Sequence, residues 1–192
     1  MIIIGLTGKI ASGKTFVSSV FKAKDFICFN SDEIVSNFYC NNQKVINSIR
    51  NIYPDLYQKG VISKENIIHA IEYNCSILDS IEEIIFPELF GYLQRFISNI
   101  KNNRILIEVP MIYKSNIYTL CHKIIVMEVS EQTQLYRINK SRTYSRQYTK
   151  IIVDRNNTNL FYGDYYISSD TTKQKLIDKV NTQINEILAT YE

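Results

Sequence analysis

A glycine-rich segment near the N-terminus holds the residues whose types and spacing point most directly to chemistry. Residues 8–15 read Gly-Lys-Ile-Ala-Ser-Gly-Lys-Thr and match G-x-x-x-x-G-K-[ST] at every fixed position. The glycines at its two ends let backbone N–H groups turn toward phosphate oxygens. The ammonium group of Lys14 can reach β- and γ-phosphates, and the hydroxyl of Thr15 can bind Mg²⁺. The pattern therefore predicts a site for a nucleoside triphosphate with Mg²⁺.

The residues on either side predict the strand and helix that must hold this loop. Residues 1–4 form an apolar run typical of a buried strand. The apolar residues after the loop recur with the spacing of one helical face, at Phe16, Val17, Val20 and Phe21. The N-terminus of that helix would add the positive end of its dipole to the phosphate site. We expect the nucleotide to be bound by Gly8, Ala11, Ser12, Gly13, Lys14, Thr15 and Phe16.

Length and composition limit the class of protein. The chain has 192 residues and a net charge of +3, which suits one α/β core with a small insertion and provides no clustered charge for nucleic acid. No apolar run approaches the roughly 20 residues that cross a membrane. We expect a cytoplasmic protein, monomeric or weakly homo-oligomeric. Its four cysteines include no C-x-x-C pair and are expected to be reduced; they are Cys28, Cys40, Cys75 and Cys121.

Apolar runs predict the remaining elements. Residues 36–100 have helical spacing and no strand pattern, with one helix ending near Pro87 and helical spacing resuming at Leu89. Residues 171–190 form an amphipathic pattern that predicts a last helix. Further strands are expected at 26–29, 104–110, 123–129 and 165–167.

Asp32 is the leading candidate for a catalytic carboxylate. It follows the second expected strand, and open α/β sheets bind ligands at the carboxyl ends of their strands. A carboxylate there could orient or deprotonate an acceptor hydroxyl beside the γ-phosphate. Two alternatives remain open at this point. Asp32 could instead be the N-cap of the next helix, and Glu33 could take the catalytic role.

Glu108 and a group of arginines complete the candidate site. Glu108 ends a buried strand, so its carboxylate needs either an ion pair or a place beside Mg²⁺, together with Thr15. The polar, arginine-rich stretch 132–159 is typical of a lid that closes over the nucleotide, although a solvated helix face would have the same composition. Arg137 is the preferred catalytic arginine, and Arg142 is a second candidate for the nucleotide site.

The order of these motifs resembles the dephospho-CoA kinase family over nearly the whole chain. Residues 5–15, read GLTGKIASGKT, look like the family's GLTGGIGSGKS, with Ala11 at one of the replaced glycines. Residues 30–32, read NSD, look like its D-A-D. Residues 108–112, read EVPMI, are similar to its D-x-P-L-L segment, and residues 134–137 match Q-x-x-R.

This resemblance implies a P-loop NTPase fold of three α/β/α layers around a mainly parallel five-stranded sheet. It also implies ATP- and Mg²⁺-dependent phosphorylation of the ribose 3′-hydroxyl of dephospho-CoA, the final step of coenzyme A synthesis, with Asp32, Lys14 and Arg137 as catalytic residues. The expected partners are ATP and dephospho-CoA, with no nucleic acid and no membrane. The expected division is a nucleotide-binding core at 1–35, 101–135 and 156–192, a helical acceptor-binding domain at 36–100 and a lid at 136–155.

The chain departs from the family pattern at several positions. Lys114 and Asn156 stand where a glutamate and a glutamine are usual. The second lid arginine would fall at Ser141, with Arg142 one position later. These changes leave two alternatives, which are another small-molecule P-loop kinase and a degenerate ATP-binding regulator without catalysis. Few arginines in the helical insertion disfavour the first, and retention of the loop with Asp32 disfavours the second.

Overall fold

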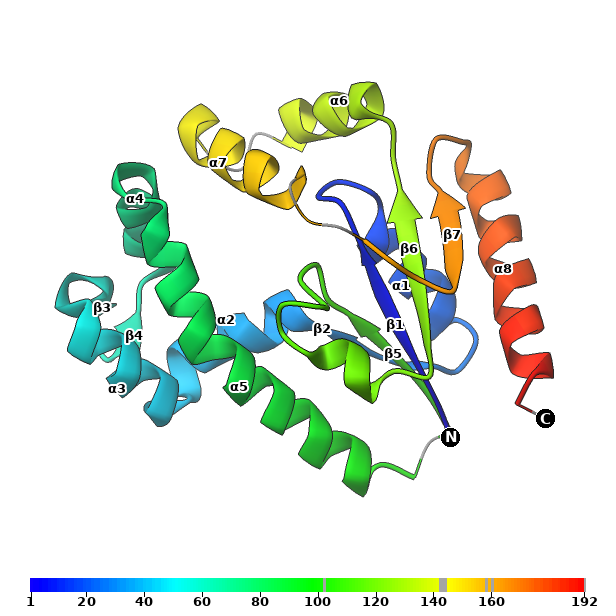
Figure 1. Cartoon of the computed structure of the whole chain (residues 1–192), viewed down its shortest axis with the longest axis horizontal. Coiled ribbons are helices and arrows are strands. Elements are labelled where there is room, and N and C mark those ends of the chain that lie inside the picture. Colours follow the sequence, from blue (N-terminus) through cyan, green and yellow to red (C-terminus); the bar gives the residue numbers. More distant parts are fainter. Residues whose placement is uncertain (102, 142–144, 158, 160, 192) are drawn as a thin grey trace.

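In the computed structural model, five strands form one sheet at the centre of the molecule (Figure 1). The structure describes residues 1–192 except 102, 142–144, 158, 160 and 192. The strands lie in the order β2-β5-β1-β6-β7, and every adjacent pair is parallel. This arrangement confirms the predicted five-stranded sheet. The strands are β1 (Ile2–Gly8), β2 (Ile27–Asn30), β5 (Arg104–Glu108), β6 (Lys123–Glu128) and β7 (Tyr165–Ser168).

Alternate residues of β1 enter two different cores. Ile2, Ile4 and Leu6 pack with α1 (Lys14–Lys22) and α8 (Lys173–Ala189) on one face of the sheet. Ile3 faces the other way and belongs to the core that the helical insertion covers. Since side chains of a strand point alternately to opposite faces, the apolar run at the N-terminus must be buried on both. The result is the predicted three-layer α/β/α fold.

The helical insertion contains a feature that the sequence pattern did not predict. A short antiparallel hairpin of β3 (Tyr57–Gln58) and β4 (Val61–Ile62) turns at Lys59 and Gly60, both with positive φ. The expectation of an insertion without strands was therefore wrong, because two-residue strands are too short to show a period of two. The helices of the insertion are α2 (Ser31–Asn41), α3 (Gln43–Ile52), α4 (Lys64–Tyr73) and α5 (Ser76–Asn99), with a 3₁₀ turn at Pro54–Leu56.

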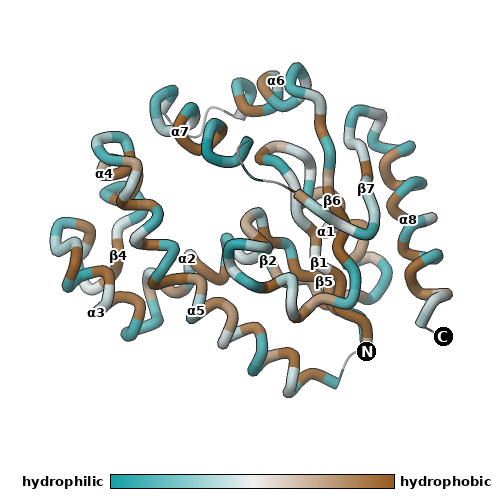
Figure 2. The backbone as a smooth tube through the Cα atoms, in the orientation of Figure 1, coloured by the Kyte–Doolittle hydropathy of each residue, from teal (hydrophilic) through white to brown (hydrophobic). Residues whose placement is uncertain are grey.

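The longest helix, α5, continues through Pro87, so the expected end there was also wrong. Proline removes one backbone hydrogen bond and usually breaks a helix. Here an unbroken apolar stripe spans the proline and is buried in one core, and its packing outweighs the local cost. Figure 2 shows the alternation of apolar and polar turns along α5 and α8. The buried stripe of α5 consists of Ile81, Ile85, Leu89, Leu93 and Ile97.

Two more helices, α6 (Glu131–Ser141) and α7 (Arg146–Asn157), occupy the segment predicted to be a lid. They lie beyond the carboxyl ends of the strands, and α7 faces the helical insertion (Figure 1). A second 3₁₀ turn, Ile117–Leu120, precedes β6. In the described part of the chain, no helix has the length and apolar character required to span a membrane.

The stripe of α5 provides a test of what stabilises the helical insertion. Leu93 has 0 % of its surface exposed, so Leu93→Ala should leave a cavity and lower the free energy of unfolding by about 2–5 kcal/mol. Gln94→Ala changes the exposed neighbour on the same helix and should stay within about 0.5 kcal/mol of wild type. Urea unfolding followed by circular dichroism measures both. Equal losses in the two variants would contradict the assignment of the stripe to the core.

Candidate active site

The glycine-rich loop, residues 8–13, runs from the end of β1 to the start of α1. Gly8 and Gly13 have φ of +136° and +90°, a backbone conformation that favours glycine. A Cβ atom on Gly8 would lie 2.3 Å from the carbonyl oxygen of Met127 in β6, so the neighbouring strand also requires glycine there. Ala11 has φ of +58°, which costs a non-glycine residue about 1 kcal/mol. Other contacts must therefore stabilise the loop.

Side chains satisfy four consecutive carbonyl groups of this loop, those of residues 8–11. Lys14 Nζ donates to the first two, at 3.0 Å each. Gln134 Nε2 donates to the third at 3.1 Å, and Arg137 Nη1 donates to the fourth at 2.9 Å. Because these acceptors are occupied, an anion bound by the loop would meet its N–H groups and the ammonium group rather than exposed carbonyl oxygens. The arrangement of the loop therefore suits an anion.

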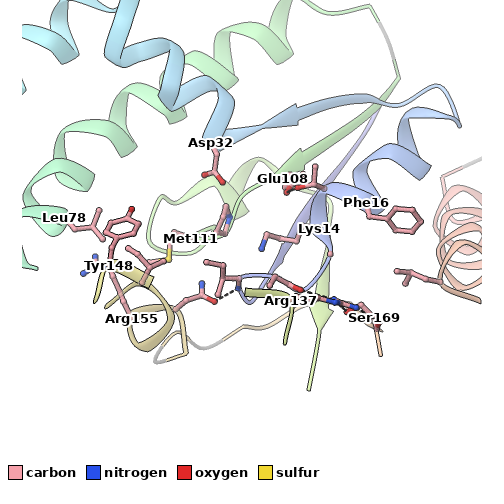
Figure 3. A pocket seen from close by; sticks show the side chains of 18 of the residues that line it. Lys14, Phe16, Asp32, Leu78, Glu108, Met111, Arg137, Tyr148, Arg155 and Ser169 are labelled. Carbon is pink, nitrogen blue, oxygen red and sulfur yellow. Dashed lines mark hydrogen bonds between the residues drawn. The ribbon is translucent and has the colours of Figure 1, made fainter. Parts of the chain in front are cut away.

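Lys14 has only 8 % of its surface exposed. Burial lowers the pKa of its ammonium group, because the charged form loses hydration. The negative charges of Glu108 and Asp32 oppose this effect. These two carboxylates lie around the lysine in Figure 3, as the predicted site required. The structure thus brings together Lys14, Asp32 and Glu108, which are far apart in the sequence.

Glu108 lies at the end of β5, between β1 and β2 of the sheet. Its Oε1 accepts a hydrogen bond of 3.0 Å from Thr15, and its Oε2 accepts one of 2.7 Å from Ser18. Among the described residues Glu108 forms no ion pair, so the structure does not support the alternative of a structural salt bridge. A buried carboxylate is instead held by two hydroxyl groups.

The surroundings of Thr15 and Glu108 fit Mg²⁺. Mg²⁺ prefers oxygen ligands and keeps several waters, so it needs only one or two protein oxygens beside substrate phosphates. Thr15 Oγ1 and Glu108 Oε1 are 3.0 Å apart and provide such a pair at the start of α1. Nowhere in the described ranges do three or more His, Cys, Asp or Glu side chains group to hold a metal without such a substrate.

Asp32 is not the N-cap of α2, which decides one of the sequence alternatives. Asn30 caps the helix, and its Oδ1 accepts from the backbone N–H groups of Asp32 at 2.9 Å and Glu33 at 3.3 Å. The Asp32 side chain is thereby available, and it points into the cavity (Figure 3). Loss of hydration raises the pKa of this carboxyl although the positive charge of Lys14 opposes the change. Glu33 does not line this cavity.

Arg137 of α6 connects the glycine-rich loop to Ser169. Besides its bond to the loop, Nη1 donates to Ser169 Oγ at 2.9 Å and Nη2 donates to the Ser169 carbonyl at 3.0 Å. The guanidinium group therefore joins α6, the glycine-rich loop and the segment after β7. Arg142, the second predicted arginine, lies outside the described residues.

A single cavity of about 800 Å³ connects these groups to the helical insertion. Figure 3 shows Phe16 at one end, Lys14 and Asp32 near the middle, and Leu78 with Tyr148 at the other end. Its walls come from the glycine-rich loop, from α1, α2, α5, α6, α7 and α8, and from the segments after β5 and β7. The cavity therefore exposes Lys14 and Asp32 to ligands that contact either the glycine-rich loop or the helical insertion.

A cluster of four charged side chains lies where α5 meets α7. Arg155 donates to Asp79 at 2.6 and 3.1 Å and to Glu82 at 2.6 Å. Lys114 donates to the same two carboxylates, at 2.7 and 2.6 Å. Hydrogen bonds from the Arg155 guanidinium and then from Lys114 hold the pKa of Asp79 well below its usual range. Two cations thus balance two carboxylates at one wall of the cavity.

Several of these residues escaped sequence reasoning. Ser18 could have been noticed, because it lies one helical turn after Thr15 and shares its face. Ser169, Asp79 and Glu82 carry no local signal, since each acts on a residue far away in the chain. They become recognisable only when the fold places them beside the site.

Comparison with known proteins agrees with this geometry. The family model described as dephospho-CoA kinase matches residues 2–159. A dephospho-CoA kinase of Ehrlichia chaffeensis is 27 % identical over 157 residues, which cover 79 % of this chain and 77 % of that protein. One of Fusobacterium nucleatum is 26 % identical over 186 residues, covering 94 % and 95 %.

A solved structure supports the fold independently. The dephospho-CoA kinase of Campylobacter jejuni superposes with a TM-score of 0.67 and 20 % identity, covering 99 % of this chain and 98 % of that one. Because the family model spans most of the chain and ends only after α7, it includes the glycine-rich loop, Asp32 and Glu108. The chain belongs to the dephospho-CoA kinase family.

Proposed function

We propose that this chain transfers the γ-phosphoryl group of ATP to the ribose 3′-hydroxyl of dephospho-CoA, giving CoA and ADP. The observation that carries the proposal is the single cavity that joins the phosphate-binding loop to Asp32 and to the helical insertion. Two substrates entering from opposite ends would meet at Lys14 and Asp32. Family membership supports the identity of the acceptor.

The loop and Lys14 would provide most of the electrostatic stabilisation of the γ-phosphate oxygens. Phosphoryl transfer requires little covalent chemistry from the protein, so catalysis depends on positioning and on stabilising charge at the γ-phosphate oxygens. Lys14 already lies at the loop, held by two carbonyl groups. An ammonium group has three N–H donors, so Lys14 can keep both carbonyl contacts and still donate a charge-assisted hydrogen bond to a phosphate oxygen.

Asp32 would accept the proton of the 3′-hydroxyl. The hydroxyl oxygen forms a bond to the γ-phosphorus, the bond to the bridging oxygen of ADP breaks, and the hydroxyl proton moves to Asp32. A raised pKa brings this carboxyl closer to the working pH, which makes it a better base than an ordinary aspartate. Its position in the cavity, separate from the helix cap, suits this role.

Thr15 and Glu108 would hold Mg²⁺, directly or through water. When bound there, Mg²⁺ would neutralise charge on the β- and γ-phosphates. Ser18 keeps Glu108 fixed through its second carboxylate oxygen, so the same carboxylate can orient Thr15.

The remaining assignments stay those of the sequence. Residues 36–100 would bind the acceptor, and residues 136–155 would form the lid. Arg137 would act near the nucleotide, at the loop it already contacts. Involvement of Arg142, a cytoplasmic location and a monomeric or weakly associated state stay predictions from the sequence.

The activity itself can be tested by acceptor-dependent ADP release with ATP and Mg²⁺. We expect turnover with dephospho-CoA and none with AMP, shikimate or no acceptor. Lys14→Ala should reduce turnover at least about a thousandfold, because the main cation at the phosphates is lost. Lys22→Ala, an exposed residue on the same helix, serves as control and should retain wild-type turnover. ATP binding without acceptor-dependent turnover in the wild type would refute the enzyme assignment.

The base role of Asp32 predicts a specific kinetic defect. Asp32→Asn should lower kcat by about 10²–10⁴-fold and change ATP affinity much less, since the proposed role of the carboxylate is toward the acceptor hydroxyl and not toward the nucleotide. In the wild type, kcat/KM should fall as the pH drops below the raised pKa of Asp32, because a protonated carboxyl cannot accept a proton. A pH–rate profile measures this limb, which should be missing from the residual activity of the variant. Near-normal kcat in the variant would remove Asp32 from this role.

The same substitution should stabilise the protein without ligands. Because folding raises the pKa of Asp32, stability is lost as the pH rises from the ordinary value of 3.8 through the raised one, and the loss is complete above it. Asp32→Asn removes this penalty, so its advantage over wild type should be larger at pH 8 than at pH 3.5 in urea unfolding. Asp55→Asn, at an exposed site, controls for the loss of one charge. An advantage that does not grow with pH would contradict the environment assigned to Asp32.

A further inference from the structure

Two neighbouring residues of α7 contact opposite walls of the cavity. Arg155 forms its ion pairs with Asp79 and Glu82 of α5, in the helical insertion. The next residue, Asn156, is buried, and its Oδ1 accepts a hydrogen bond of 2.6 Å from the backbone N–H of Ile10 in the glycine-rich loop. Successive residues of a helix point about 100° apart, so one turn of α7 can reach both walls.

The contact of Arg155 with α5 consists of three charge-assisted hydrogen bonds to two carboxylates. Both terminal nitrogens of Arg155 donate to Asp79, and one of them also donates to Glu82, which lies on the same face of α5 three residues later. Paired hydrogen bonds from a planar guanidinium group restrict orientation as well as distance. Lys114 donates to the same carboxylates and keeps the cluster neutral.

α7 has a second attachment to the insertion at its other end. Gln147 Nε2 donates to the backbone carbonyl of Glu72, at the C-terminal end of α4, at 2.8 Å. The hydroxyl of Ser145 hydrogen-bonds to the carboxylate of the same glutamate. Attached at both ends, α7 should follow the insertion as one body if the insertion moves.

The contact with the loop acts at a sensitive place. Ile10 is bound on both sides, because Asn156 accepts from its N–H and Gln134 donates to its carbonyl. The next residue, Ala11, has the unfavourable φ of +58° and depends on such contacts. A displacement of α7 would therefore reach the part of the loop that is hardest to maintain.

We propose that Arg155 and Asn156 are positioning residues that couple acceptor binding in the helical insertion to nucleotide binding in the loop. The inference rests on the proposed function, because it needs both substrates in the one cavity. Acceptor bound against α5 fixes the insertion, Arg155 transmits that position to α7, and Asn156 transmits it to the Ile10 amide. Coupling of this kind is reciprocal, so each substrate should raise the affinity of the other by the same factor.

The test is the affinity of the full-length protein for Mg²⁺ and a non-hydrolysable ATP analogue, measured calorimetrically with and without saturating dephospho-CoA. The wild type should bind the analogue at least about fivefold more tightly when dephospho-CoA is present. In Arg155→Met and in Asn156→Ala this factor should fall below about twofold. Since the two residues act in series, the double variant should show no further loss.

Two more variants separate coupling from general stability. Arg155→Lys keeps the charge and should retain more coupling than Arg155→Met. Lys44→Met removes the cation of another ion pair to α5, with Glu88, which does not involve α7, and should keep the wild-type factor. Thermal unfolding of every variant accompanies the binding data. A lower Tm in Arg155→Met with an unchanged coupling factor would mean that Arg155 contributes only to stability, and would overturn the proposal.

The remaining outcomes distinguish this inference from the proposed function. A wild type that binds both ligands without mutual effect, and still phosphorylates dephospho-CoA, would overturn the coupling alone. A wild type that binds the ATP analogue but neither binds nor phosphorylates dephospho-CoA would overturn the proposed function and the coupling with it. Loss of coupling in both single variants, with the control unchanged, would support the positions assigned to Arg155 and Asn156.

Discussion

The orientation of one short stretch of backbone, the carbonyl groups of residues 8–11, determines how the rest of the site must be built. All four accept hydrogen bonds from side chains, supplied by Lys14, Gln134 and Arg137. These donors come from the loop's own helix and from α6, which is why α6 must lie across the carboxyl ends of the strands. The anion site is therefore not a property of the glycine-rich motif alone, since it depends on elements more than a hundred residues away.

The elements near the motif could be predicted because their signals are local. Apolar runs and the spacing of the loop identified the strands and the positions of Lys14, Thr15 and Asp32, and the family resemblance implied that the sheet is mainly parallel. Prediction from local sequence failed where the burial of a long apolar stripe outweighed a local signal. α5 passes Pro87 because its apolar stripe is buried on both sides of that residue. At the start of α2 the structure decides between two readings that the sequence left open, because Asn30 caps the helix and leaves the side chain of Asp32 to the cavity.

The contacts that complete the site could not be predicted from one sequence. Ile10 and Asn156 are 146 residues apart, and Arg155 and Asp79 are 76 apart. Nothing in the local pattern of either partner indicates the other, and a charge on a helix is usually solvated. Lys114 is an example. In the sequence it is only a departure from the family pattern, which has a glutamate there, whereas the structure shows that two carboxylates of α5 balance its charge.

Charge balance also explains how a site with a buried lysine and two carboxylates remains folded without substrate. Burial shifts Lys14 and Asp32 in opposite directions, lowering one pKa and raising the other, and the attraction between them opposes both shifts. Each group therefore makes the charged state of the other less costly. Triphosphate at the loop would compete with the carboxylates for Lys14, and a weaker attraction to the lysine would leave Asp32 more basic. Under the proposed function, bound nucleotide would therefore make Asp32 a stronger base for the acceptor hydroxyl before the γ-phosphoryl group is transferred.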